Sequence, residues 1–125
     1  MTNKRTLGIG VISLGWMGRL HARSYRAIAE RFPELEVAPR LVAAADPVDQ
    51  VRQEAVDNLG FERAYADYHD LLADPEVEAV SICAPNFLHH EMALAAVKAG
   101  KPFWIEKPME LPRSEERRVG KECRS

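Results

Sequence analysis

Apolar and polar positions follow two periods along this chain, and the two periods alternate in a regular order. Short apolar runs rich in β-branched residues are typical of strands that are buried on both faces. Longer segments between them carry apolar positions at helical spacing. The strand-like runs are residues 7–12, 41–45, 61–65, 79–84 and 103–105. Strands separated by helices imply right-handed crossovers, so the pattern predicts an α/β fold: a doubly wound parallel sheet of about five strands with helices on both faces.

The first predicted helix has a stripe of small and apolar side chains, with arginines on its other face. The stripe is formed by Met17, Leu20, Ser24, Ala27 and Ile28. Pro33 prevents this helix from continuing. Pro47 suits the first position of a second helix, which is expected to stop at Gly60. Shorter helices are expected over residues 67–73 and 91–99.

Residues 113–125 follow neither period and cannot bury a face. They match, residue for residue, the translation of a standard sequencing-library adapter, so we interpret them as non-native read-through. A natural charged tail is the alternative. Removing their five basic and three acidic residues from the chain's 17 and 19 leaves 12 and 16 in residues 1–112, a net charge of −4. That balance gives no electrostatic footprint for nucleic acid.

Cys83 is the one cysteine of residues 1–112, so no internal disulfide is expected, and a reducing compartment is favoured. A metal site that combines it with His89, His90 and Glu91 is not expected, because adjacent histidines do not share one face. No long apolar segment follows the charged start of the chain. The sequence therefore predicts a cytoplasmic protein with no membrane partner.

The turn after the first strand has the sequence Ser13-Leu14-Gly15-Trp16-Met17-Gly18. In a dinucleotide-binding loop, the second glycine admits the pyrophosphate and the third lets the helix pack on the strand. Gly15 and Gly18 hold those places, whereas Ser13 holds the first. Serine lacks the freedom of glycine at positive φ, so the turn must be less extreme or mildly strained. We expect all six residues to form a cofactor-binding loop, with Trp16 packing or shielding the pocket; a glycine-rich turn without a ligand is the alternative.

Asp46 ends the second predicted strand. An acid at that position can accept hydrogen bonds from both ribose hydroxyls and would repel a 2′-phosphate. No basic residue follows it directly, so the sequence favours NAD over NADP as the cofactor. The alternative is that Asp46, which precedes Pro47, only caps a helix.

Three further stretches resemble the Gfo/Idh/MocA family of oxidoreductases. They are Ala84-Pro85-Asn86-Phe87-Leu88-His89, Ala99-Gly100-Lys101 and Glu106-Lys107-Pro108. With the glycine loop, they extend the resemblance from Leu7 to about Leu111. It implies a Rossmann-type domain in which the loop after the fourth strand borders an NAD(P) cofactor.

The same resemblance assigns roles to particular side chains. The residues that it adds to the cofactor site are Pro85, Asn86, His89, Glu106, Lys107 and Pro108. Lys107 is the expected catalytic residue, because a lysine at a strand end can hold a substrate hydroxyl and share in proton transfer. Glu106 would orient it. The alternatives are a loop or first-turn role for His89 and an ordinary surface position for Lys107.

By this likeness, the intact protein is an NAD(P)-dependent dehydrogenase that moves a hydride between nicotinamide and a sugar, cyclitol or related polyol. Residues 1–112 are then an incomplete dinucleotide-binding domain, and the substrate domain is absent. We expect the chain alone to be inactive and, with an apolar edge at residues 103–105, to aggregate. A homo-oligomer is expected only for the intact protein. The alternatives are a cofactor-binding regulator without turnover and a truncated gene product without activity.

The origin of residues 113–125 is decided by sequencing the genomic locus again. We expect the native reading frame to depart from this sequence after the codon for Pro112. An uninterrupted native frame that encodes residues 113–125 would contradict the read-through hypothesis.

Overall fold

The computed structural model describes residues 5–32, 34 and 36–105. Its strands form one parallel sheet in the order β3-β2-β1-β4-β5. They are β1 (Arg5–Ile12), β2 (Val37–Ala45), β3 (Arg63–Tyr65), β4 (Ala79–Ile82) and β5 (Phe103–Ile105). The predicted doubly wound sheet is confirmed. β2 begins at Val37 rather than at residue 41, because its first half pairs with the exposed start of β1 and lacks the apolar pattern of a buried strand.

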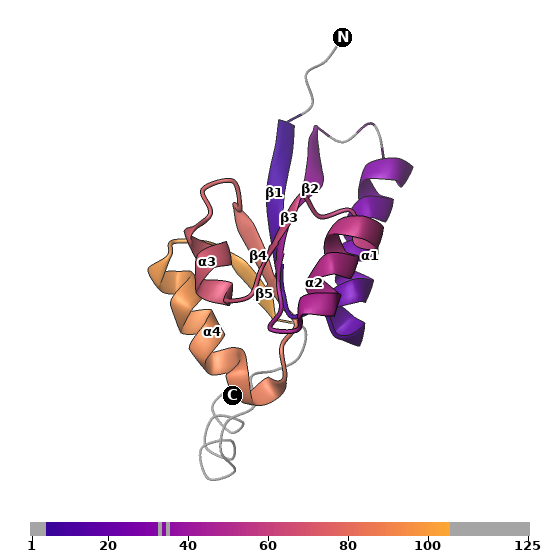
Figure 1. The fold of residues 1–125 in the computed structure, drawn as a ribbon. Coiled ribbons are helices and arrows are strands. Elements are labelled where there is room, and N and C mark those ends of the chain that lie inside the picture. The colour runs from indigo at the N-terminus through magenta and orange to yellow at the C-terminus, as the bar shows by residue number, and fades with distance from the viewer. Residues whose placement is uncertain (1–4, 33, 35, 106–125) are drawn as a thin grey trace, which may run out of the picture.

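The helices lie in two layers, with α1 and α2 on one face of the sheet and α3 and α4 on the other (Figure 1). They are α1 (Trp16–Arg31), α2 (Asp49–Glu54), its π-helical continuation η1 (Ala55–Leu59), α3 (Tyr68–Ala73) and α4 (Asn86–Lys98). Gly60 ends η1 at a φ of 91°, as its predicted role as a helix stop requires. The strand order reverses between β1 and β4. Open α/β sheets bind their ligands at such a reversal, beyond the carboxyl ends of the strands.

α4 begins earlier than the sequence pattern predicted. We expected residues 85–90 to form a loop, but the helix begins at Asn86, directly after Pro85. Proline favours this arrangement because its fixed φ is compatible with a helix N-terminus and its missing N–H would be unpaired there in any case. The start of α4 therefore belongs to the edge of the sheet where ligands bind.

The stripe predicted for α1 is not the face that packs on the sheet. Ala22 is fully buried, whereas Leu20 and Ile28 are 44% and 36% exposed. The prediction was wrong because the small residues Gly18 and Ala22, which a hydropathy pattern weights little, bring the helix close to the sheet and to the turn after β1. A Cβ added to Gly18 would lie 2.1 Å from the carbonyl oxygen of Ser13, so only glycine allows this approach.

The misassigned stripe instead borders an open apolar groove between α1 and β5. Met17, Leu20, Ile28 and Trp104 are among its lining residues, and its volume is about 330 Å³. No helix in the described part of the chain covers β5 on the face of the sheet that carries α1 (Figure 1). Exposed apolar surface of this kind promotes association. The aggregation expected for the isolated chain stays a prediction, and this groove is where we expect it to begin.

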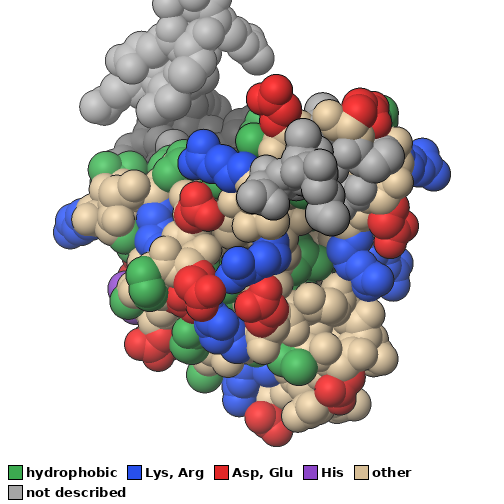
Figure 2. Space-filling view, turned by 90° about the horizontal axis from the view of Figure 1, so that it is seen from above, with side chains coloured by type: hydrophobic (Ala, Val, Ile, Leu, Met, Phe, Trp, Pro, Cys, Tyr) green, Lys and Arg blue, Asp and Glu red, His purple; other side chains and the backbone are tan. Residues whose placement is uncertain are grey.

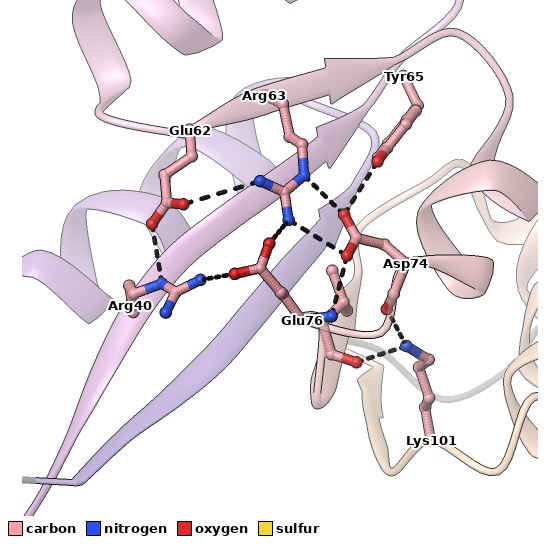
Figure 3. Close-up of polar contacts among 8 residues, drawn as sticks. Arg40, Glu62, Arg63, Tyr65, Asp74, Glu76 and Lys101 are labelled. Atoms are coloured by element: carbon pink, nitrogen blue, oxygen red, sulfur yellow. Dashed lines mark hydrogen bonds and ion pairs between the residues drawn. The ribbon is translucent and has the colours of Figure 1, made fainter.

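A network of charged side chains joins the amino ends of the strands (Figure 3). Asp74, which is buried, accepts hydrogen bonds from Arg63 Nε at 2.7 Å and Tyr65 Oη at 2.9 Å. Arg63 also pairs with Glu76. Acidic and basic side chains alternate over this end of the molecule (Figure 2). The Arg63 guanidinium holds the pKa of Asp74 at about 2, because it stabilises the carboxylate form.

Lys101 completes this network. Its Nζ donates to the carbonyl oxygens of Asp74 at 2.6 Å and Val77 at 2.5 Å. Burial lowers the pKa of the Lys101 ammonium group. Its motif position before β5 therefore serves to fix the turn between α3 and β4, far from the carboxyl edge of the sheet.

Replacing Asp74 by asparagine should lower stability at neutral pH and flatten its dependence on acid. The pKa of Asp74 lies below that of an unfolded aspartate, so its contribution is complete above about pH 4 and is lost as the pH falls toward about 2. We expect a loss of about 2 kcal/mol in the free energy of unfolding at neutral pH. The measurement is the unfolding midpoint of the full-length protein across this pH range.

Asp70→Asn is the matched control, because Asp70 is an exposed aspartate of the neighbouring helix α3. It should leave the acid dependence as it is in the unmodified protein. Equal acid unfolding curves for Asp74→Asn and the unmodified protein would contradict the assignment.

Candidate functional site

The turns that follow β1, β2 and β4 meet at the carboxyl edge of the sheet and enclose a pocket of about 260 Å³. Its lining residues are Ile12, Ser13, Ala45, Asp46, Pro47, Ala66, Tyr68, Ala84, Pro85, Leu88 and Met92. Most of these are apolar, and the polar side chains are those of Ser13, Asp46 and Tyr68. A largely apolar cavity with a few polar groups suits a flat base joined to a sugar.

The sequence allowed either a less extreme turn or a mildly strained turn at Ser13, and the loop between β1 and α1 adopts the strained one. Ser13 has a φ of 74°, and it is the one residue other than glycine with a positive φ in the described ranges. Its N–H donates to the carbonyl oxygen of Ala45 at 2.7 Å, which holds the strained turn against β2. Arg19 Nε donates to the carbonyl oxygen of Leu14 at 3.2 Å. The loop is thus fixed by contacts on both sides before any ligand binds.

Gly15 and Gly18 divide the two roles expected of them. A Cβ added to Gly15 would meet no atom within 4 Å, so protein packing does not require glycine there and the space is open to a ligand. Gly18 is needed for packing, as the short distance to Ser13 shows. Gly15 is also the N-cap of α1 and makes no side-chain hydrogen bond, which leaves first-turn N–H groups without a side-chain cap. Such N–H groups are suited to stabilise a phosphate.

Asp46 joins two loops through its carboxylate. Its Oδ2 accepts the Leu14 N–H at 3.0 Å and its Oδ1 accepts the Val48 N–H at 2.9 Å. The side chain does not cap α2, whose N-cap is Val48 without a side-chain hydrogen bond. Asp46 is only 8% exposed, but it lines the pocket, and each of its oxygens keeps a second lone pair. It can therefore still accept hydrogen bonds from ribose hydroxyls.

The residues expected after β4 lie in two different environments. Pro85 lines the pocket, and Asn86 is the first residue of α4. His89 is 2% exposed and does not line the pocket; its Nε2 lies 2.6 Å from the carbonyl oxygen of Ala84. His89 thus contacts the wall of the pocket from behind.

Two aromatic side chains at this edge are exposed. Trp16 and Phe87, in the first turns of α1 and α4, are each 78% exposed. Trp16 therefore does not pack against the described residues, contrary to one of the two roles expected for it. Met17 faces the groove beside α1 rather than the pocket.

Several lining residues were not singled out from the sequence. Ala66 and Tyr68 follow β3, and Leu88 and Met92 lie on α4. Burial raises the pKa of the Tyr68 phenol, so the group is neutral at physiological pH. Met92 is an apolar position of the helix that was predicted over residues 91–99, but no pattern in the sequence distinguishes a pocket wall from a core position.

Glu106, Lys107 and Pro108 lie outside the described residues, as does the segment 113–125. Within the described part of the chain, no group of three or more histidine, cysteine or acidic side chains is placed to hold a metal ion. No helix of that part is long and apolar enough to span a membrane.

The two glycines predict opposite effects of the same substitution. Gly15→Ala should leave stability within about 0.5 kcal/mol of the unmodified protein, because its Cβ meets open space. It should weaken NAD binding at least about ten-fold, because the methyl group occupies the space that the pyrophosphate needs. Gly18→Ala should instead cost about 2 kcal/mol of stability through its clash with Ser13. Thermal unfolding and NAD titration of the full-length protein separate the two. Unchanged NAD affinity in Gly15→Ala would contradict the assignment of the loop.

Comparison with known proteins places these features in a family. The family model GFO_IDH_MocA, described as an oxidoreductase family with an NAD-binding Rossmann fold, matches residues 7–125. The matched range includes residues 113–125, so the origin of that segment stays a prediction.

Curated relatives include a levoglucosan dehydrogenase of Pseudarthrobacter phenanthrenivorans, 37% identical over 84% of this chain and 27% of the relative. A myo-inositol 2-dehydrogenase of Thermotoga maritima is 37% identical over 82% of this chain and 28% of its own length. Similar solved structures include an NAD binding oxidoreductase from Klebsiella pneumoniae, with a TM-score of 0.81 and 39% identity over 95% of this chain and 32% of that one. A levoglucosan dehydrogenase in complex with NADH has a TM-score of 0.78 and 34% identity over 84% of this chain and 28% of that one. The chain thus spans about a quarter to a third of the length of these proteins.

Proposed function

The chain belongs to the Gfo/Idh/MocA family of oxidoreductases, which has an NAD-binding Rossmann fold, and from that premise we propose that it is the NAD-binding part of a dehydrogenase for a sugar, cyclitol or related polyol. The observation that carries the proposal is the hydrogen bond from Leu14 to Asp46, because it joins the glycine loop to an acid on the rim of an apolar pocket. The substrate class is supported by the names of the relatives, which are sugar and cyclitol dehydrogenases.

In this proposal, the adenosine half of the cofactor occupies the pocket and its ribose hydroxyls donate to Asp46. The pyrophosphate lies over Gly15, where a Cβ would meet nothing, and accepts hydrogen bonds from the first-turn N–H groups of α1. Asp46 favours NAD, because a 2′-phosphate beside its carboxylate would be repelled. When bound, the nicotinamide accepts or donates a hydride.

We assign Lys107 to the reacting end of the site. It follows β5, whose carboxyl end lies at the same edge of the sheet as Ser13, Asp46 and Pro85. Its ammonium group would hold the substrate hydroxyl that is oxidised, and Glu106 would orient it through an ion pair. Pro108 would fix the backbone after the lysine.

Compartment and partners follow from charge and composition. The net charge of −4 in residues 1–112 supports a small-molecule substrate rather than nucleic acid. A single cysteine in those residues supports a reducing compartment such as the cytoplasm. We expect a homo-oligomer only for the intact protein, because the intact protein has all the surfaces through which its subunits would associate.

The test is turnover by the full-length protein with NAD and a panel of sugars and cyclitols, followed by the absorbance of NADH. Lys107→Met should lower kcat by about 100-fold or more and change the affinity for NAD by less than about three-fold, because the lysine acts on the substrate. Lys98→Met, at an exposed lysine in the last turn of α4, is the control and should retain full activity.

Two outcomes would overturn parts of this proposal. A full-length protein that binds neither NAD nor NADH is not a dehydrogenase of this kind. Binding without turnover of any substrate in the panel, together with unchanged properties in Lys107→Met, would favour a cofactor-binding regulator.

A further inference from the structure

His89 is a buried titratable side chain at the edge of the pocket. It is 2% exposed, whereas its neighbour His90 is exposed. Its Nε2 lies 2.6 Å from the carbonyl oxygen of Ala84. A carbonyl oxygen can only accept a hydrogen bond, so Nε2 must carry the proton and the ring is held in that tautomer.

The other ring nitrogen limits what this histidine can do. Nδ1 is buried and has no hydrogen-bond partner among the described residues. The bond from Nε2 to the Ala84 carbonyl is therefore the one hydrogen bond that the ring makes with the described residues.

The accepting carbonyl belongs to the wall of the pocket. Ala84 is buried, and both it and Pro85 line the cavity. They follow β4, whereas Asp46 and Pro47 follow β2, and these two strands flank β1 on opposite sides. Pro85 has no N–H, so its own backbone nitrogen cannot anchor the turn through a hydrogen bond. The Leu88 N–H donates to the Pro85 carbonyl at 2.9 Å, which closes the first turn of α4 onto the next peptide along the chain. The bond from His89 fixes this turn from the side that faces away from the pocket.

We propose that His89 is a positioning residue for the cofactor: it holds the Ala84 carbonyl and so sets the position of the Ala84–Pro85 wall against the adenine base. This inference rests on the proposed function and deepens it, because it concerns the same pocket. The family resemblance placed His89 in contact with the cofactor. In this proposal His89 instead acts on the cofactor indirectly, through the Ala84 carbonyl. A base that fits between two fixed walls loses affinity when one wall is free to move, since the wall must then be ordered on binding.

Four variants of the full-length protein test this role. His89→Phe keeps much of the ring's volume and removes the donor. His89→Gln restores an N–H donor near the position of Nε2, whereas His89→Asn is too short to reach the Ala84 carbonyl. His90→Phe is the matched control at the adjacent exposed histidine. The measurements are the Kd values for NAD, for AMP as a probe of the adenosine half, and for nicotinamide mononucleotide as a probe of the other half.

We expect His89→Phe and His89→Asn to weaken NAD and AMP binding by about the same factor, about ten-fold, the value of one net hydrogen bond. Binding of nicotinamide mononucleotide should stay within about two-fold, and kcat should stay near its original value while KM for NAD rises. His89→Gln should recover AMP affinity to within about three-fold, and His90→Phe should bind AMP like the unmodified protein. A role in stability alone would lower the unfolding temperature without separating AMP from nicotinamide mononucleotide.

The possible failures are distinguishable. If the unmodified protein binds neither NAD nor AMP, the proposed function fails. If it binds both and His89→Phe binds AMP equally well, only the positioning role of His89 is overturned. If His89→Phe does not fold, His89→Asn and His89→Gln decide, and equal AMP affinities in these two variants overturn the role.

Discussion

The buried carboxylate of Asp46 accepts one N–H from the loop after β1 and another from the turn after β2. These loops belong to neighbouring strands of the sheet and have no covalent link near this point. A buried carboxylate that accepts two backbone N–H groups, one from each loop, stabilises both loops. The position of the glycine loop relative to the pocket depends on this arrangement, and so does every assignment of a cofactor group to that edge.

The glycine loop is ordered by the protein itself. Ser13 is held at a positive φ by its hydrogen bond to Ala45, and Arg19 binds the Leu14 carbonyl while pairing with Glu54. A loop that such contacts already fix loses less entropy on binding a ligand than a mobile loop does. The strain at Ser13 is of the kind that functional loops retain, because surrounding contacts determine the conformation more strongly than local preference does.

The two ends of the sheet have different chemistry. Charged side chains that are paired with one another occupy the amino ends, and their salt bridges join β3 to the turn before β4. Lys101 binds backbone carbonyl oxygens of that same turn. The carboxyl ends present a largely apolar pocket with Asp46 at its rim and uncapped N–H groups beside it. Satisfied pairs contribute to folding and leave no group for a ligand. The open positions at the opposite end are what a cofactor can use.

The sequence by itself determined the parallel sheet and the places of the glycine loop and Asp46 at strand ends, because strand period, glycine spacing and strand ends are local properties of the chain. It named Pro85 only through the family resemblance. It misjudged the packed face of α1, since close approach at Gly18 and Ala22 depends on the strand beside them. It also named His89 and Lys101 without their partners. Only the tertiary structure decided that His89 holds the Ala84 carbonyl, that Lys101 binds the turn before β4, and that Tyr68 and Met92 line the pocket. Each of these contacts joins residues whose spatial relation depends on how the helices pack across the sheet or meet its turns, and no local pattern encodes that relation.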